Sequence, residues 1–488
     1  MQKPTTPGRN LSRWCRLGAV VIACVGWTTG QAAEPAPLAP DHLPPVVQAA
    51  WARTGLPQSA LAWVVADTQP RGTVWVQHRA DAPVNPASTL KLVTSFAALD
   101  LLGPAYTWRT AVYADGPVQG GVLQGSLYIK GGGDPKLVTE RLWLLARRLQ
   151  GLGMQRIQGD LVLDRSAFDL PPHDPGQFDG EPLRPYNASP DALLINYKSQ
   201  VWTFVPDPSA GVARVSVEPP LAGVSTPTTV PLSGEGCGDW RGGLKAQWTD
   251  ALRPQFKGHY PAACGERHWP VAHPEPERYA ARAVAGMWAQ VGGQLDGVVR
   301  EGVVPSHATL RLSWESPPLA EVVRDVNKFS NNVMAQHLLL ALGLPTTPSG
   351  GPSGFEKARQ VVATWWPLRM GADTPLPVVD NGAGLSRQSR ATATALARLL
   401  QVAYGSGLMP DLMASLPLSG LDGTLRRSRT ATGTAHLKTG SLNDVVALAG
   451  YIHGADGRRR VFVAVVNHPD ARQSKPALDA MVQWASQW

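Results

Sequence analysis

The sequence predicts an α/β (α+β) protein in which an antiparallel sheet carries helices on its faces and a β-rich insertion interrupts the chain. Three observations lead to this fold class. Strand-like runs stand near both ends of the chain, helix-like runs adjoin them, and the middle alternates short strand-like runs with Pro- and Gly-rich turns. The strands expected in the sheet are residues 61–67, 73–78, 434–440, 445–452 and 460–466.

Helices are expected on both sides of the insertion, because apolar residues recur there at helical spacing. The last of them closes the chain, and a hairpin turn at residues 455–457 precedes it. The expected helices are residues 45–54, 86–102, 319–327, 331–342, 354–365, 391–403 and 475–488.

The insertion is predicted to span residues 104–302 and to contain two nested β-rich subdomains. The flanking segments, residues 34–103 and 303–488, would then be the two halves of one domain. Inside the insertion we expect one helix at 138–150 and strands that include residues 121–129, 159–163 and 212–217.

The composition is that of a loop-rich globular protein with a mild basic excess. Charged residues make up 17% of the 488 residues, whereas Gly and Pro number 49 and 44. The formal net charge is +8, but four of the basic residues lie in the first 32 positions, where no acidic residue occurs, so the rest of the chain carries 8 − 4 = +4. Such an excess favours an anionic surface such as a cell envelope and does not indicate nucleic-acid binding.

Residues 1–32 have the pattern of a secretory signal peptide, with basic residues followed by an apolar run at 17–27. This run is too short for the roughly 20 residues that span a bilayer. Such a signal would direct the protein across the inner membrane into the periplasm, and cleavage after Ala32 or Ala33 would release it as a soluble protein. Two alternatives remain open, a lipoprotein anchored through Cys24 and an uncleaved anchor.

Cleavage would leave Cys237 and Cys264, and an even pair in an oxidising compartment predicts a disulfide. Closing a loop of this size would stabilise the fold by about 3–4 kcal/mol. A zinc site is the rival interpretation, because His268 and His273 follow Cys264, but the spacing is loose and the compartment does not favour thiolates.

The most informative stretch is Ser88-Thr-Leu-Lys91, just after Pro86 at the start of an expected helix. Residues three apart share a helix face at about 5–6 Å between Cβ atoms. A serine hydroxyl needs a base to become a nucleophile, and a half-buried lysine with a lowered pKa can be that base. The non-catalytic alternative is a helix-capping serine with an exposed lysine one turn later.

Two later motifs favour the catalytic interpretation. Ser330-x-Asn332 stands between two expected helices, and Lys438-Thr439-Gly440 stands on a strand of the sheet. Other hydrolase classes lack their signatures here, since the chain has no Gly-x-Ser-x-Gly elbow and no His-Glu-x-x-His. The glycine-rich run at 131–135 lacks the ending of a phosphate loop and is expected to be a turn.

These three motifs, in this order, resemble those of the penicillin-binding proteins and serine β-lactamases. The long gap between Lys91 and Ser330 is similar to that of the low-molecular-mass class C penicillin-binding proteins, which are D-alanyl-D-alanine carboxypeptidase/endopeptidases. The resemblance covers residues 40–488. Further stretches similar to that family are residues 131–135, 159–164, 380–387, 416–426 and 448–451.

The resemblance implies a penicillin-binding transpeptidase-like domain with a five-stranded antiparallel sheet, and it implies a role for each motif residue. Ser88 would attack a carbonyl between D-configured residues, and Lys91 would take the serine proton. Ser330 would relay that proton to the leaving amine, while Asn332 would bind the substrate amide and restrain Lys91. Lys438 would attract the terminal carboxylate toward the Ser88 site.

The rest of the Lys438 strand would bind substrate. The resemblance assigns the hydroxyls of Thr439 and Ser441 to the substrate carboxylate and places Gly440 between them. Backbone N–H groups of Ser88 and Ser441 would hold the oxyanion.

Recognition of the substrate side chain is implied for four further residues, Asp179, Glu181, Tyr186 and Arg387, although a surface ion pair or a packing role is an equal alternative for each. Two departures from the family pattern, Lys136 and Ala383, are expected to leave the core chemistry untouched.

The implied partners are peptidoglycan stem peptides and, as covalent inhibitors, β-lactam antibiotics, with no nucleic acid, cofactor or metal. Peripheral membrane association and a homodimer stay open, as does the balance of carboxypeptidase against endopeptidase activity. Two other function classes remain to be tested, a serine β-lactamase and a catalytically silent peptidoglycan-binding protein.

Overall fold

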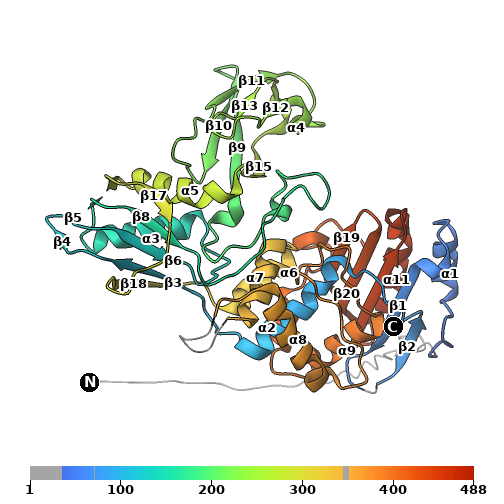
Figure 1. The fold of residues 1–488 in the computed structure, drawn as a ribbon. Helices are drawn as coiled ribbons and strands as arrows, with labels where there is room; N and C mark the ends of the chain where they lie inside the picture. Colours follow the sequence, from blue (N-terminus) through green and yellow to red (C-terminus); the bar gives the residue numbers. More distant parts are fainter. Residues whose placement is uncertain (1–35, 71, 345–350) are drawn as a thin grey trace, which may run out of the picture. The chain divides into compact units, whose positions relative to one another are not determined.

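The strands expected from the two ends of the chain form one antiparallel sheet in the order β19-β20-β21-β1-β2 (Figure 1). A computed structural model describes residues 36–70, 72–344 and 351–488, and the expected signal segment lies outside these ranges. The sheet confirms the predicted fold class. Its strands are β1 (Leu61–Asp67), β2 (Val74–His78), β19 (Ala435–Leu442), β20 (Val445–His453) and β21 (Arg459–Asn467).

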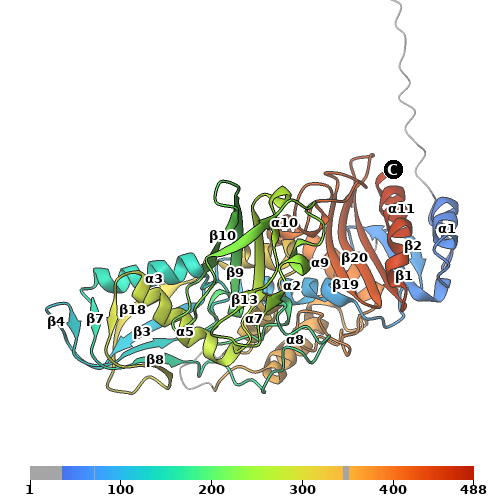
Figure 2. The same cartoon turned by 90° about the horizontal axis from the view of Figure 1, so that it is seen from above.

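Both faces of this sheet are covered by helices, so its central strands are apolar on both sides. Along β1, Trp63 packs with α1 and α11 on one face, whereas Val64 packs with α2 and α9 on the other. Figures 1 and 2 show the C-terminal helix α11 beside the strands of this sheet. The two helices on the Trp63 face are α1 (Pro45–Ala52) and α11 (Lys475–Ser486).

The opposite face carries the helices that hold the motif residues. Most begin and end within a few residues of the expected positions, but α8 runs past Pro367, whereas the sequence predicted an end at residue 365. A short helix after α9 was not expected. These helices are α2 (Lys91–Leu102), α6 (Leu319–Lys328), α7 (Asn332–Leu342), α8 (Phe355–Met370), α9 (Ala393–Tyr404) and α10 (Met409–Ser415).

The part of the chain between α2 and α6 contains a second five-stranded sheet, in the order β17-β8-β6-β3-β18. Its strands β3 and β18 pair antiparallel, which places the chain entering this region next to the chain leaving it. A four-stranded sheet, β16-β7-β5-β4, adjoins it. The strands of this five-stranded sheet are β3 (Arg109–Ala114), β6 (Leu127–Lys130), β8 (Leu161–Asp164), β17 (Val299–Glu301) and β18 (Thr309–Glu315). Those of the four-stranded sheet are β4 (Val118–Gln119), β5 (Val122–Leu123), β7 (Arg156–Ile157) and β16 (Gln294–Leu295).

The expected strand at 121–129 is divided into β5 and β6, and Asp115 accounts for the break. Its carboxylate accepts a hydrogen bond from the backbone N–H of Ser126 at 2.6 Å, which draws the chain out of the β5 ladder. Helices α3 (Thr139–Gly151) and α5 (Pro276–Gln290) share one apolar core with these strands.

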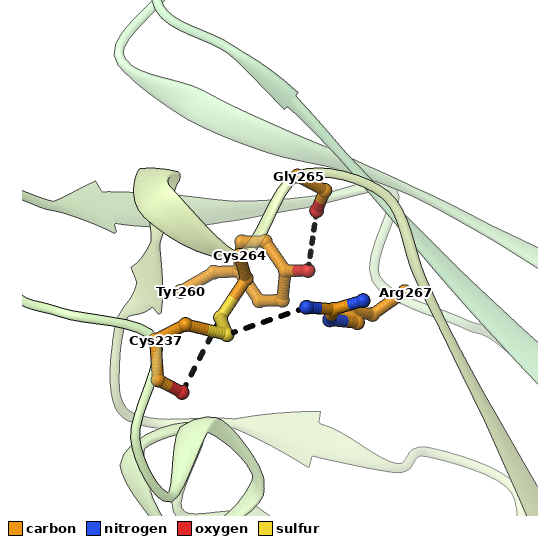
Figure 3. Close-up of a disulfide and its surroundings, with 5 residues drawn as sticks. All are labelled: Cys237, Tyr260, Cys264, Gly265 and Arg267. Carbon is orange, nitrogen blue, oxygen red and sulfur yellow. Dashed lines mark hydrogen bonds between the residues drawn. A yellow bond between two sulfur atoms is a disulfide. The ribbon is translucent and has the colours of Figure 1, made fainter. Parts of the chain in front are cut away.

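A further β-rich part has a separate small core, built around Trp202, Phe204 and Tyr260. Cys237 and Cys264 are joined here by a disulfide with an S–S distance of 2.06 Å, so they offer no thiolate to a zinc ion (Figure 3). The strands of this part are β9 (Ser199–Asp207), β10 (Val212–Glu218), β11 (Thr229–Ser233), β12 (Ala246–Gln247), β13 (Gln255–Phe256), β14 (Tyr260–Pro261) and β15 (Arg267–Ala272), with α4 (Trp240–Gly243) between them.

Within the described ranges, none of the helices combines the length and the apolar character that crossing a bilayer requires.

Candidate active site

Ser88 lies on a single 3-10 turn, Ala87–Leu90 (η2), which leads directly into α2. The sequence predicted an α-helical first turn, and the difference starts at Ala87, whose φ of 45° is left-handed. This conformation is disfavoured for a residue with a side chain. It is supported by Asn85, whose side-chain Oδ1 accepts a hydrogen bond from the Ala87 N–H at 2.9 Å.

A pair of asparagines fastens this turn to the sheet. Asn467, the last residue of β21, accepts a hydrogen bond from the Asn85 N–H at 2.7 Å and donates one to the Asn85 carbonyl at 3.0 Å. The Asn85 side chain also donates to the Ser386 carbonyl at 2.9 Å. The nucleophile turn is therefore tied to the sheet and to the 380–389 loop, and sequence reasoning predicted neither contact.

Lys91 is fully buried and its ammonium nitrogen lies 2.9 Å from Ser88 Oγ. The same nitrogen donates to Asn332 Oδ1 and to the Ala383 carbonyl, both at 2.6 Å. Burial lowers the pKa of Lys91 well below its usual value, and the nearby charge of Lys438 lowers this pKa further. The side chain expected to be half-buried is thus wholly enclosed and suited to accept a proton.

Ser330 and Asn332 stand at the start of α7. The side chain of Asn331 caps this helix by accepting a hydrogen bond from the Met334 N–H at 3.1 Å. Ser330 has a φ of 55°, an uncommon conformation for a serine, which marks the turn between α6 and α7 as constrained. Asn332 uses its Oδ1 for Lys91 and its Nδ2 for the Tyr186 carbonyl at 3.0 Å, so it positions the lysine from one side.

Lys438 lies on β19, which is one of the two edge strands of the sheet and faces the nucleophile turn. Its nitrogen donates to Ser330 Oγ at 2.9 Å and to the Thr439 carbonyl at 2.8 Å. Burial lowers the pKa of Lys438 to about 7. Each lysine therefore contacts a different hydroxyl, Lys91 that of Ser88 and Lys438 that of Ser330.

The remainder of this strand borders the same site. Gly440 approaches the nucleophile turn so closely that an added Cβ would lie 2.8 Å from the Pro86 carbonyl oxygen. The Thr439 hydroxyl lies 2.8 Å from that of Thr424, while Ser441 is exposed.

The four residues expected to read the substrate side chain fall into separate contacts. Arg387 pairs with Asp444 at 2.9 Å, and its guanidinium lies 4.7 Å from the centre of the Phe178 ring. Tyr186 donates its hydroxyl proton to Asp179 at 2.9 Å.

Glu181 is exposed and pairs with Arg184 at 3.3 Å. Only Tyr186 reaches the core of the site directly, through the bond between its backbone carbonyl and Asn332.

Ala383 was expected to leave the core chemistry untouched, and the structure corrects this for its backbone, because the Ala383 carbonyl accepts a hydrogen bond from Lys91. This contact uses the backbone, so the identity of the side chain carried no signal of it. Lys136, the other departure, forms an ion pair with Asp325 instead of contacting these catalytic candidates.

The sheet, the nucleophile turn at the head of α2 and the three motifs around it define a serine-type peptidase of the penicillin-binding class. The chain belongs to the D-Ala-D-Ala carboxypeptidase 3 (S13) family, whose model matches residues 46–488. The predicted membership of the low-molecular-mass class C penicillin-binding proteins is thereby confirmed.

Individual relatives agree with this membership. The chain is 30% identical over 401 residues to the D-alanyl-D-alanine carboxypeptidase of Actinomadura sp. (strain R39), covering 76% of this chain and 71% of the relative. It is 25% identical over 393 residues to the D-alanyl-D-alanine carboxypeptidase DacB of Haemophilus influenzae, covering 78% and 80% of the two chains. The crystal structure of penicillin binding protein 4 from Haemophilus influenzae superposes with a TM-score of 0.70 at 24% identity, covering 91% of this chain and 99% of that chain.

Proposed function

We propose that this enzyme hydrolyses peptidoglycan stem peptides and their cross-links as a D-alanyl-D-alanine carboxypeptidase and DD-endopeptidase, through an acyl-enzyme on Ser88. The observation that carries the proposal is the position of a fully buried lysine 2.9 Å from the Ser88 hydroxyl. Such a lysine favours its neutral form, which is the form that can remove the serine proton.

The contacts of Lys91 suit both the neutral amine and the ammonium. A neutral lysine has two N–H donors and one lone pair, and the two acceptors at 2.6 Å, Asn332 Oδ1 and the Ala383 carbonyl, occupy both donors. The lone pair is then left for the Ser88 hydroxyl, which donates its proton along this contact. Once protonated, the ammonium has three donors for three acceptors.

In the first half-reaction, Ser88 Oγ bonds to the substrate carbonyl carbon as Lys91 takes the serine proton. Backbone N–H groups of Ser88 and Ser441 hold the oxyanion, each worth about 10²–10³ in turnover. The C–N bond then breaks, and the proton passes from Lys91 through Ser330 to the leaving amine. A water molecule hydrolyses the ester and regenerates Ser88.

Recognition of the substrate falls to two groups of residues in this proposal. Lys438, Thr439 and Ser441 bind the carboxylate of the leaving residue, with Gly440 keeping the strand close to the nucleophile turn. Arg387 and Tyr186 border the substrate side chain, and Asp179 orients Tyr186 through the hydrogen bond between them. Glu181 contributes to substrate recognition only indirectly, through its ion pair with Arg184.

We also propose that residues 34–103 and 303–488, except for β18, form the catalytic domain, and that residues 104–302 together with β18 form an insertion with two nested subdomains. The pairing of β3 with β18 supports this, because it brings the two junctions together. Residues 1–32 are proposed to direct export to the periplasm. Mass spectrometry of the N-terminal peptide of the mature protein would test this by locating the cleavage site.

The deciding experiment incubates purified enzyme with an uncross-linked pentapeptide, a cross-linked dimer, a fluorescent penicillin and a chromogenic cephalosporin. We expect release of D-alanine, cleavage of the dimer, a stable penicillin adduct and slow cephalosporin turnover, all lost in Ser88→Ala. Rapid multiple turnover of the cephalosporin would instead identify a β-lactamase. Absence of both adduct and products would identify a silent binding protein.

A further inference from the structure

Two large apolar side chains are exposed beside the candidate active site. Phe329, directly before Ser330, keeps 65% of its surface exposed, and Leu421, in the loop after α10, keeps 60%. Exposed apolar side chains are common on proteins, but an aromatic residue beside a catalytic candidate on constrained backbone is a reason to look for a ligand. We call Phe329 and Leu421 together the apolar rim.

The backbone that carries the apolar rim is held in place by the buried side chain of Lys328. Lys328, which is 5% exposed, donates to the Leu416 carbonyl at 2.6 Å and to Asp422 Oδ2 at 2.5 Å. Gly423 lies so close that an added Cβ would be 2.5 Å from the Lys328 carbonyl oxygen. The two segments of the rim are therefore tied together through the residue that precedes Phe329.

The apolar rim lies at the end of the site where Lys438 and Thr439 stand. The Thr424 hydroxyl, three residues after Leu421, contacts the Thr439 hydroxyl at 2.8 Å, and Ser330 contacts Lys438. Thr439 and Lys438 are the groups proposed above to bind the carboxylate of the leaving residue.

We propose that the apolar rim binds the second stem peptide of a cross-linked substrate, on the leaving-group side of the scissile bond, and so favours endopeptidase over carboxypeptidase activity. The inference rests on the proposed function. A terminal D-alanine offers only a methyl group beyond its carboxylate, which is too small to reach an extended rim. In a cross-link the leaving residue carries a longer aliphatic side chain, and burying it against Phe329 and Leu421 removes apolar surface from water.

The test compares two substrates in two double variants. In Phe329→Ala/Leu421→Ala, kcat/KM for a purified cross-linked dimer should fall about tenfold, equivalent to about 1.4 kcal/mol of lost transition-state binding. The value for the uncross-linked pentapeptide and the rate of penicillin acylation should both stay within about twofold of the parent enzyme. The volume-conserving variant Phe329→Leu/Leu421→Met should retain most of the activity on the dimer.

A matched control is Leu368→Ala, since Leu368 on α8 is 83% exposed and lies outside the proposed machinery. It should leave both substrates unaffected. An equal loss on dimer and pentapeptide, or no loss on the dimer, would overturn the inference, as would a parent enzyme that hydrolyses the pentapeptide but not the dimer. Failure of the proposed function is distinct, because the parent enzyme would then form no penicillin adduct and release no product.

Discussion

Lys91 Nζ lies 2.9 Å from Ser88 Oγ, and the Lys91 side chain is fully buried whereas Ser88 is partly exposed. Burial lowers the pKa of this lysine, and the positive charge of Lys438 lowers it further. The two other contacts of the nitrogen come from elements far away in the chain, Asn332 on α7 and the Ala383 carbonyl. Tertiary packing therefore places a buried lysine with a lowered pKa against the Ser88 hydroxyl, as the proposed nucleophile and base require.

Replacing Lys91 by Met should remove the base while filling nearly the same volume. Acylation of Ser88 by a fluorescent penicillin should slow by about 10²–10⁴, the contribution of a positioned general base. Asn332 Oδ1 and the Ala383 carbonyl would lose their partner, which should cost about 1–3 kcal/mol of stability. Stopped-flow labelling and thermal denaturation measure the two effects, and acylation at nearly the parental rate would refute the role of Lys91.

The charge of Lys438 should set the pH at which Lys91 becomes active. Below the pKa of about 7 to which burial lowers Lys438, its positive charge disfavours a second charge on Lys91 and lowers the pKa of Lys91. In Lys438→Met this repulsion is absent, so the pKa of Lys91 should rise. The rising, acidic limb of the pH profile for penicillin acylation should therefore move to higher pH, whatever the loss in absolute rate.

The profile is measured as the second-order acylation rate between about pH 5 and 9, on both sides of the pKa of about 7 of Lys438. Lys475→Met, which changes an exposed lysine at the start of α11, is the control and should leave the limb in place. An acidic limb that stays at the parental pH in Lys438→Met would show that the two lysines are not coupled.

Sequence reasoning reached the parts of the site that are encoded locally or by motif. The i, i+3 spacing of Ser88 and Lys91 is local, and the sheet followed from strand-like apolar runs near both chain ends. The Asn85–Asn467 clamp spans 382 residues and leaves no local pattern, while the Ala383 contact involves only a backbone carbonyl. Neither kind of contact can be read from residue types alone.

The β-rich parts were also harder to predict in detail. Strand β15 contains Pro270, which argues against a strand in a sequence pattern, but this strand lies at the edge of its sheet, where proline is tolerated. Strands β12, β13 and β14 have two residues each, too short to produce an alternation. Their positions depend on the small aromatic core and on the disulfide.

Asn467 is expected to act as a positioning residue for Ser88. In Asn467→Ala the nucleophile turn loses two hydrogen bonds to the backbone of Asn85, at 2.7 and 3.0 Å, without losing any group that touches substrate. The free energy of unfolding should fall by about 1–3 kcal/mol. Acylation should slow about tenfold through misplacement of the hydroxyl, with the pH profile unchanged in position.

An exposed amide serves as the control for this variant. Gln473→Ala removes a side chain from the turn that precedes α11 and should alter neither stability nor acylation. Loss of stability in Asn467→Ala with full retention of the acylation rate would mean that the clamp only supports the fold.

The disulfide should stabilise its own small core and leave the chemistry unaffected. Cys237 and Cys264 are separated by 27 residues, and closing a loop of this size lowers the entropy of the unfolded chain. The double variant Cys237→Ser/Cys264→Ser should therefore lose about 3 kcal/mol of stability. Limited proteolysis should detect earlier cleavage within residues 199–272, while penicillin labelling of the folded fraction should match that of the parent enzyme.

Gly384 provides a steric test of the nucleophile turn. An added Cβ there would lie 1.9 Å from the Ala87 carbonyl oxygen and 3.1 Å from the Ser88 nitrogen, so Gly384→Ala must displace the turn that carries the nucleophile. The φ of 73° at this position adds backbone strain of about 1–2 kcal/mol. Acylation should fall at least about 10²-fold, because small misplacements of a reacting group have effects of this size.

Gly55→Ala separates strain from displacement. Gly55 has nearly the same φ, 70°, but an added Cβ would meet no atom within 4 Å. Both variants should therefore lose about 1–2 kcal/mol to the left-handed backbone, whereas only Gly384→Ala should lose acylation and the additional stability that the clash removes. Equal acylation rates in the two variants would mean that the 380–389 loop can move away from Ala87, and that the Ala383 carbonyl is not needed to hold Lys91 against Ser88.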